Sequence, residues 1–236
     1  MARSIKQLYG NRLAANDGEI GSVRDFYFDD QSWATRYVVA ETGTWLTSQQ
    51  VLLSPHAFGV FQPFEKSLSV DLSRKQIEDS PTIEWYRPVS RQFEEEYHRY
   101  YGWPNYWEGD GLWGGMRSLP ILELTERVPP NAAAWAKKRK GADAHLRSTQ
   151  VIRGYQLRAS NGNIGHICDF MMDEESWAID ELVIKTGNRF SGDEVLIPVH
   201  KISRISCDDS TVFVNMTREA VAHSPAAQLA LEGAFA

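Results

Sequence analysis

The sequence lacks any apolar run long enough to cross a membrane. No stretch of about 18 consecutive apolar residues occurs in the chain. The chain begins MARSIK and continues into polar sequence, where a signal peptide would carry its hydrophobic core. We therefore expect no transmembrane segment, no secretion and a cytoplasmic location.

Cysteine is scarce, and no metal-binding spacing is present. Cys168 and Cys207 are the two cysteines, and they form no CxxC pair and no His/Cys cluster with the spacing of a zinc site. We interpret them as structural thiols of a protein in a reducing compartment, and we expect neither a metal nor a cofactor.

The usual local signatures of catalysis are also missing. The sequence contains no GxSxG, no GxxxxGK[ST] and no HExxH. Gly109 to Gly114 match GxGxxG by letter, but no strand pattern precedes them and Ser118-Leu119-Pro120 follows where a nucleotide-binding helix would begin. We predict that the protein is not an enzyme, although a site built from dispersed residues stays open.

The charge balance disfavours generic nucleic-acid binding. The formal net charge of −6 repels polyphosphate, so no strong nucleic-acid signal is present. The one basic run, Lys137-Lys138-Arg139-Lys140, is typical of a solvated linker, with contact to an acidic partner as the alternative.

An internal repeat organises the chain. Residues 3–81 align without a gap to residues 147–225 at an offset of 144, with 24 of 79 positions identical. Paired glycines and prolines, which mark turns, recur at the same places: Gly10 with Gly154, Gly18 with Gly162, Gly21 with Gly165, Gly43 with Gly187, and Ser80-Pro81 with Ser224-Pro225.

Each copy has the pattern of short strands followed by one short helix. Residues 23–28 and 33–39 read as a hairpin around a polar turn, and residues 167–172 and 177–184 repeat it. Ser73 and Thr217 are expected helix N-caps; Gln76 completes a capping box in the first copy, whereas Ala220 breaks it in the second. About 79 residues of this kind favour a small β-barrel over a sandwich of about 100 residues.

The order of motifs in both copies, Gly-x-x-Leu, Asp/Asn-Gly-x-Ile-Gly, Asp-Phe-x-x-Asp, Ser-Trp and Thr-Gly, with Ser-Pro after the helix, resembles the PRC-barrel family, named after the photosynthetic reaction-centre H subunit. The resemblance implies an all-β fold with minor α: two PRC-type barrels in tandem, at 1–81 and 147–225, an aromatic-rich spacer at 82–146 and a tail at 226–236. Arg189-Phe190 replaces Trp45-Leu46, and Asp180 replaces Arg36, so the two barrel surfaces are expected to differ.

The spacer is rich in aromatic residues. Phe93, Tyr97, Tyr100 and Tyr101 follow helical spacing over residues 90–101, while Glu94, Glu95 and Arg99 are expected to face elsewhere. One interpretation packs the rings on a barrel; the sharper one makes part of them a partner-binding surface, because Tyr and Trp are favoured interface anchors. The candidate partner-binding residues are Tyr97, Tyr100, Tyr101, Trp103, Tyr106 and Trp107.

Three polar pairs occupy equal positions in the two copies: His56 with His200, Asp25 with Asp169, and Asp29 with Asp173. They suggest either a metal or acid/base pair in each copy or structural roles. We favour structure, because Asp29 and Asp173 stand where a hairpin turn needs a side chain to bond its own backbone. Asp25 and Asp169 lie in strand patterns, where a backbone or Arg partner is the ordinary one.

The leading functional hypothesis is a non-catalytic interaction or scaffolding protein with a protein partner. The resemblance agrees with it, since PRC barrels occur in the H subunit and in a ribosome-maturation factor, both of which bind partners. The alternatives are an H-subunit-like protein associated with a membrane electron-transfer complex, and a ribosome- or RNA-associated factor. Peripheral membrane association and homo-oligomerisation also stay open.

Overall fold

The computed structural model describes residues 1–43, 49–59, 66–80, 91–106, 146–187 and 192–227, with only the backbone for residues 91–93 and 96. The chain forms two compact units. One contains Met1–Gly10, Arg24–Val38 and Arg147–Ala236; the other contains Asn11–Val23 and Val39–Leu146. Both units draw on the first repeat, so the domain boundaries expected from the sequence stay a prediction.

The first repeat is built of short strands and three helical turns, followed by one longer helix in the spacer. Its strands are β1 (Ala2–Ser4), β2 (Arg12–Ala15), β3 (Gly18–Asp29), β4 (Thr35–Thr42), β5 (Gln49–Leu53) and β6 (Ser67–Val70). Its helices are α1 (Ile5–Leu8), η1 (Pro55–Ala57), α2 (Arg74–Glu78) and the spacer helix α3 (Arg91–Tyr101).

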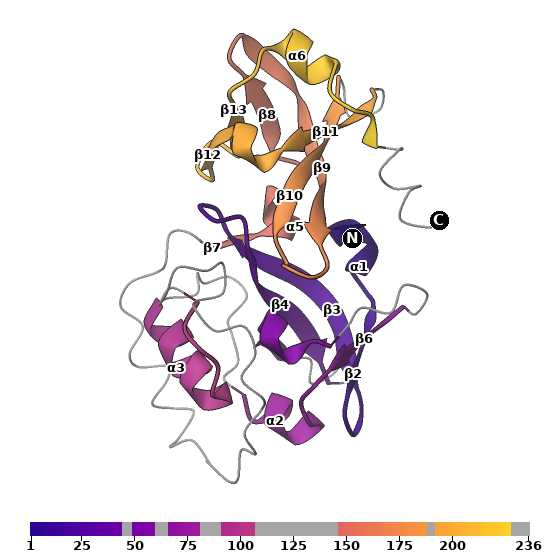
Figure 1. Ribbon diagram of the computed structural model, residues 1–236, viewed down its shortest axis with the longest axis vertical. Helices are drawn as coiled ribbons and strands as arrows, with labels where there is room; N and C mark the ends of the chain where they lie inside the picture. Colours follow the sequence, from indigo (N-terminus) through magenta and orange to yellow (C-terminus); the bar gives the residue numbers. More distant parts are fainter. Residues whose placement is uncertain (44–48, 60–65, 81–90, 107–145, 188–191, 228–236) are drawn as a thin grey trace. The chain divides into compact units, whose positions relative to one another are not determined.

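The second repeat follows the same order. Its strands are β7 (Leu146–Ser148), β8 (Gln156–Ala159), β9 (Gly162–Asp173), β10 (Ile179–Thr186), β11 (Glu194–Pro198), β12 (Ile202–Ser206) and β13 (Thr211–Val214). Its helical turns are α5 (Thr149–Ile152), η2 (Val199–Lys201) and α6 (Arg218–Ala222). The predicted class, all-β with minor α, is confirmed (Figure 1).

The two sheets share the order of five equivalent strands, and the second adds β12 at its edge. The pairs β2–β3 and β2–β6 have the same register as β8–β9 and β8–β13. One runs β5-β4-β3-β2-β6 and the other β11-β10-β9-β8-β13-β12. Strand β6 pairs in parallel with β2, and β13 pairs in parallel with β8. Leu13 lies opposite Leu68, and Leu157 opposite Val212, which are the same two positions under the 144-residue offset. A parallel pair needs a long crossover, and it is supplied by the segment that contains β3 to β5 in the first copy and β9 to β12 in the second.

Gly21 and Gly165 are conserved between the copies for a reason other than a turn. Both lie inside long strands, β3 and β9. A Cβ on Gly21 would stand 1.9 Å from the Glu41 carbonyl oxygen, and one on Gly165 would stand 2.1 Å from that of Lys185. The sequence-based assignment of these two glycines to turns is therefore wrong: glycine permits a close approach of neighbouring strands.

The helix caps follow the sequence. Ser73 Oγ accepts from the Gln76 amide at 3.3 Å, and Gln76 Oε1 accepts from the Ser73 amide at 2.8 Å, so the predicted capping box is complete. Thr217 caps α6 by accepting from the Ala220 amide at 3.2 Å, and the methyl group of Ala220 cannot accept a hydrogen bond from the Thr217 amide in return.

The first compact unit joins segments from both repeats. Strand β1 of the first repeat pairs antiparallel with β9 of the second, with Ser4 opposite Met171. Strand β7 of the second repeat pairs with β3 of the first. Each repeat therefore places its leading strand on the long strand of the other, and we call this arrangement the exchange junction.

The two hairpin tips also meet within this unit. Trp33 and Trp177 both have φ of 57°, a left-handed conformation that is rare for a bulky residue. The Trp177 carbonyl accepts from the Thr35 amide at 2.8 Å, and the Trp33 carbonyl accepts from the Ile179 amide at 2.7 Å. Trp177 is buried and Trp33 partly buried, so the two rings occupy equivalent places, as the repeat predicts.

Candidate functional site

The described part of the aromatic spacer, residues 91–106, packs against the first repeat. Helix α3 places Tyr97 fully inside, and its hydroxyl donates to the Leu52 carbonyl of β5. The Tyr101 ring stacks on Trp103, with centroids 4.2 Å apart and planes 11° apart. Burial raises the pKa of Tyr97 and of Tyr101 well above the ordinary tyrosine value, so both hydroxyls stay protonated.

The candidate partner-binding residues divide into buried and partly exposed rings. Tyr97, Tyr101 and Tyr106 are buried, whereas Tyr100 and Trp103 keep part of their surface in solvent. The Tyr100 ring meets Tyr101 edge-on at 4.8 Å, and its hydroxyl donates to the Gln76 carbonyl at 3.3 Å. Trp107 lies outside the described residues, as do the Gly109–Gly114 match and the basic run at 137–140.

Two polar residues are buried beside these rings. Glu94 was expected to face away from the aromatic stripe, and this expectation is wrong: Glu94 is fully buried and accepts from the Tyr106 hydroxyl at 2.8 Å. His98 is also buried, and its Nδ1 shares a hydrogen bond with the Pro104 carbonyl at 2.7 Å. Their spacing of four residues, next to Tyr97 and Tyr101, is a signal that both lie on the packed face.

Asp169 is a central acceptor of the exchange junction. It lies on β9, buried, and accepts from Ser4 Oγ at 2.5 Å, from the Lys6 amide at 2.9 Å and from its neighbour Phe170. Ser4 is itself the N-cap of α1. The carboxylate thus fixes the start of a helix that belongs to the other repeat.

Asp25 makes the equivalent contacts in the other direction, from the first repeat to the second. It accepts from Ser148 Oγ at 2.5 Å, from Thr149 Oγ1 at 2.9 Å and from the Gln150 amide at 3.1 Å. Burial raises the pKa of both aspartates, against the opposing effect of these hydrogen bonds. The expected structural role is correct, but the partners were missed because they lie in the other repeat.

Ion pairs and one ring contact complete the junction. Arg3 pairs with Glu174, and Arg147 pairs with Asp30 at 2.7 Å, which is the same pairing under the 144-residue offset. Tyr9 shares a 2.8 Å hydrogen bond with Thr149, and the Arg153 guanidinium lies 5.4 Å from the centroid of the Tyr9 ring.

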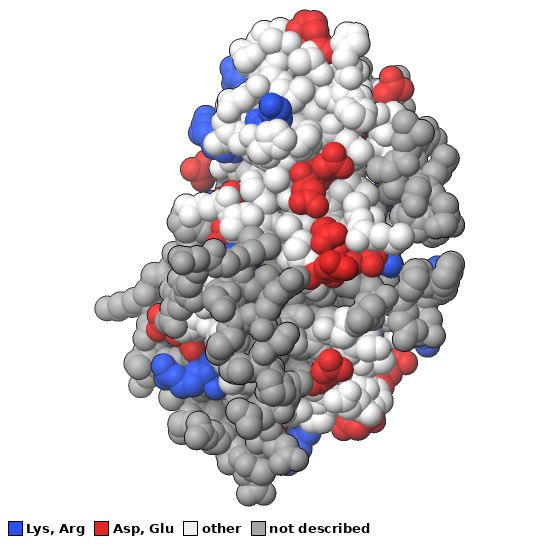
Figure 2. Space-filling model, viewed as in Figure 1, with Lys and Arg blue, Asp and Glu red and all other residues white. Residues whose placement is uncertain are grey.

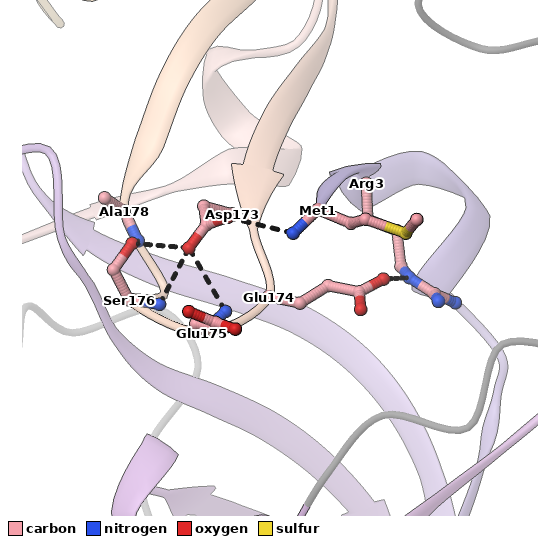
Figure 3. Close-up of polar contacts among 7 residues, drawn as sticks. All are labelled: Met1, Arg3, Asp173, Glu174, Glu175, Ser176 and Ala178. Atoms are coloured by element: carbon pink, nitrogen blue, oxygen red, sulfur yellow. Dashed lines mark hydrogen bonds and ion pairs between the residues drawn. The ribbon is translucent and has the colours of Figure 1, made fainter. Parts of the chain in front are cut away.

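Asp29 and Asp173 bond their own turns, as predicted. Figure 3 shows the turn of Asp173. Asp173 Oδ1 accepts from the Glu175 amide at 3.2 Å and from the Ser176 amide at 2.9 Å. Asp29 Oδ1 accepts equivalently at 2.9 Å from Gln31 and 3.0 Å from Ser32. The Ser176 amide is the main cause that lowers the pKa of Asp173 to about 2.

The paired histidines give no sign of a common ligand set. The His56 ring lies 6.3 Å from Trp103, and His200 is exposed on η2. Across the described part of the chain, no group of three or more His, Cys, Asp or Glu side chains could hold a metal ion. Cys168 and Cys207 are free thiols. On the face seen in Figure 2, acidic and basic side chains gather in small separate groups.

The comparisons bear on the second repeat. Residues 151–221 match the family model described as PRC-barrel domain, and the match runs from the end of α5 through most of α6. This match confirms the family resemblance there, and the shared strand order and register relate the first repeat to it. The comparison with curated proteins gave no match.

Proposed function

Because its second repeat is a PRC-barrel domain, we propose that this chain is a non-catalytic scaffold that docks a protein partner through the exposed edge of its aromatic spacer. The observation that carries the proposal is the state of Tyr100 and Trp103. Both are partly exposed, and both are held against the buried Tyr101. Aromatic rings fixed at a surface are the residue types that most often anchor protein interfaces.

The buried neighbours keep the two exposed rings in place. Trp103 lies between the stacked Tyr101 and the edge of His98, whose centroid is 6.3 Å away. The Trp103 amide donates to the His98 carbonyl at 2.9 Å, which fixes the backbone as well. A partner that contacts these rings has little side-chain freedom to remove, so more of the contact energy remains as affinity.

Site-specific photo-crosslinking in cells tests this proposal. A photoreactive phenylalanine replaces Tyr100 in one variant and Glu95 in another; Glu95 is exposed on the same helix and serves as the matched control. We expect one protein adduct of defined mass from position 100 and none from position 95. Equal labelling from both positions, or no adduct from position 100, contradicts the proposal.

A second variant separates binding from stability. Trp103→Ala is expected to abolish the adduct formed from position 100 while the protein keeps most of its thermal stability, since Trp103 is only partly buried. If the adduct persists and the melting temperature falls, the ring is structural and the docking role is wrong. Trp107 stays a prediction from the sequence.

Among the described residues, no helix is both long and apolar enough to span a bilayer. The basic run that suggested RNA lies outside those residues, and none of the contacts described above favours the membrane or the RNA alternative over docking. We therefore propose protein docking alone, with absence of catalysis as part of the same proposal.

A further inference from the structure

The exchange junction is self-complementary. Its ion pairs, its aspartate caps and its hairpin-tip hydrogen bonds each occur twice, related by the 144-residue offset. Such reciprocity, where residue i of one patch meets residue j of its copy and j meets i, defines the isologous interface of a two-fold dimer. Here the two patches belong to two repeats of one chain.

We propose that the same junction also forms between two copies of this chain, so that the first repeat of each copy pairs with the second repeat of the other. The partner that this surface fits is therefore a second copy of the protein. The contacts recognise a barrel with an Arg-Ser leading segment, an aspartate on its long strand and a second acidic residue in the turn just after that strand, and both repeats of any copy provide them. This inference is independent of the docking role of Tyr100 and Trp103.

The covalent link decides which form dominates. Joining the repeats through residues 82–146 gives their contact an effective concentration on the order of millimolar. Below that concentration the junction closes within one chain, and the exchanged dimer accumulates as the protein concentration approaches it. A change that penalises the closed chain and spares the exchanged pair should shift the balance at any concentration.

The two ion pairs provide that change. Their side chains are only 13–23% exposed, so reversed charges cannot be relieved fully by solvent. In variant R3E/R147E, the new glutamates lie opposite Glu174 and Asp30 of the same chain, so two acidic residues repel each other at both places. In variant D30R/E174R, the new arginines lie opposite Arg147 and Arg3 and repel them in the same way. When the two variants form an exchanged dimer, each of its four ion-pair contacts joins one arginine to one acidic residue.

The experiment measures mass in solution after refolding from urea. Each variant alone is expected to be a monomer near the wild-type 26.8 kDa with a lowered melting temperature. Refolded together at micromolar concentration, they are expected to form a one-to-one dimer of twice that mass, with the melting temperature restored. The control R3E/D30R/R147E/E174R regains the pairs within one chain and is expected to be monomeric.

A mixture that remains monomeric with both melting temperatures lowered overturns the proposal, and so does a control that dimerises as readily as the mixture. If the charge reversals prevent folding even in the mixture, the wild type decides. Tagged and untagged wild-type chains refolded together at about 1 mM, in the range of that effective concentration, should yield a dimer fraction containing both. A dimer fraction without mixed species, or none, overturns it.

Discussion

Replacing Asp169 by alanine should open one side of the exchange junction. The substitution removes the acceptor of Ser4 Oγ, of the Lys6 amide and of the Phe170 amide. A hydrogen bond to a charged group contributes roughly 1.5–3 kcal/mol, and the regained hydration of a buried carboxylate offsets part of the sum. We expect a loss of about 3 kcal/mol in the free energy of unfolding, or about 6–12 °C in melting temperature for a chain of this size.

Asp25→Ala should cost more than Asp169→Ala. Thr149 adds a hydroxyl donor to Asp25, and the equivalent position beside Asp169 is Ile5, which has none. Asp169→Asn should cost only about 1 kcal/mol, because an amide oxygen still accepts and the Ser4 hydroxyl can turn to accept in return.

Urea unfolding followed by tryptophan fluorescence measures these differences, with the exposed Asp208→Ala as control. If both alanine variants lose less than about 0.5 kcal/mol, as ordinary surface substitutions do, then the two aspartates do not hold the junction together. A larger loss for Asp169 than for Asp25 would refute the assigned donors.

Four further substitutions or pH changes have expected outcomes. Gly21→Ala should lower the free energy of unfolding by about 3 kcal/mol or more, because its Cβ would clash with backbone. Gly10→Ala should lower it by only about 1 kcal/mol, because its Cβ meets no atom within 4 Å and only the positive φ is unfavourable. Thermal melts measure both. Gln76→Ala should cost about 0.5–1 kcal/mol in urea unfolding by breaking the capping box. Asp173 has a lowered pKa, so it stabilises the fold above the ordinary 3.8, and this contribution is lost as pH falls to about 2; the stability difference between the wild type and Asp173→Asn should vanish there. Asp25 and Asp169 have raised pKa values, so the part of their stabilisation that depends on the protonated carboxyl is full below 3.8 and is lost as pH rises through the folded-state pKa. The hydrogen bonds to the ionised carboxylates remain above that pKa; relative to the double variant D25N/D169N, the wild type should lose stability over the rise.

Contacts within a few residues were predictable from the sequence. Asp29 and Asp173 bond amides two and three residues ahead, and Ser73 bonds Gln76 three residues ahead, so residue type and spacing define the geometry. The repeat added more, because equal spacing in two copies requires equal strand order. The all-β class with minor α could therefore be predicted from the sequence, with the family resemblance pointing to the barrel.

Contacts made between the repeats could not be predicted in that way. Asp25 meets Ser148, 123 residues later, and nothing in either local pattern names the partner. The pattern of each copy predicts an aspartate inside a strand and a serine before a helix. It does not predict that the aspartate of one copy binds the serine of the other. Glu94 was misplaced for a similar reason: its burial depends on the Tyr106 hydroxyl beyond the end of the helix.

Amide hydrogen exchange at Thr35 and Ile179 tests the central structural claim, that the two repeats pair through one reciprocal junction. Each amide donates to the tryptophan carbonyl at the opposite hairpin tip, Trp177 and Trp33 respectively. We expect both amides to exchange slowly and to a similar degree, and Asp25→Ala to accelerate the exchange of both together. If the two amides exchange as fast as in an unstructured peptide while the strand amides of β3 and β9 stay protected, the junction does not form.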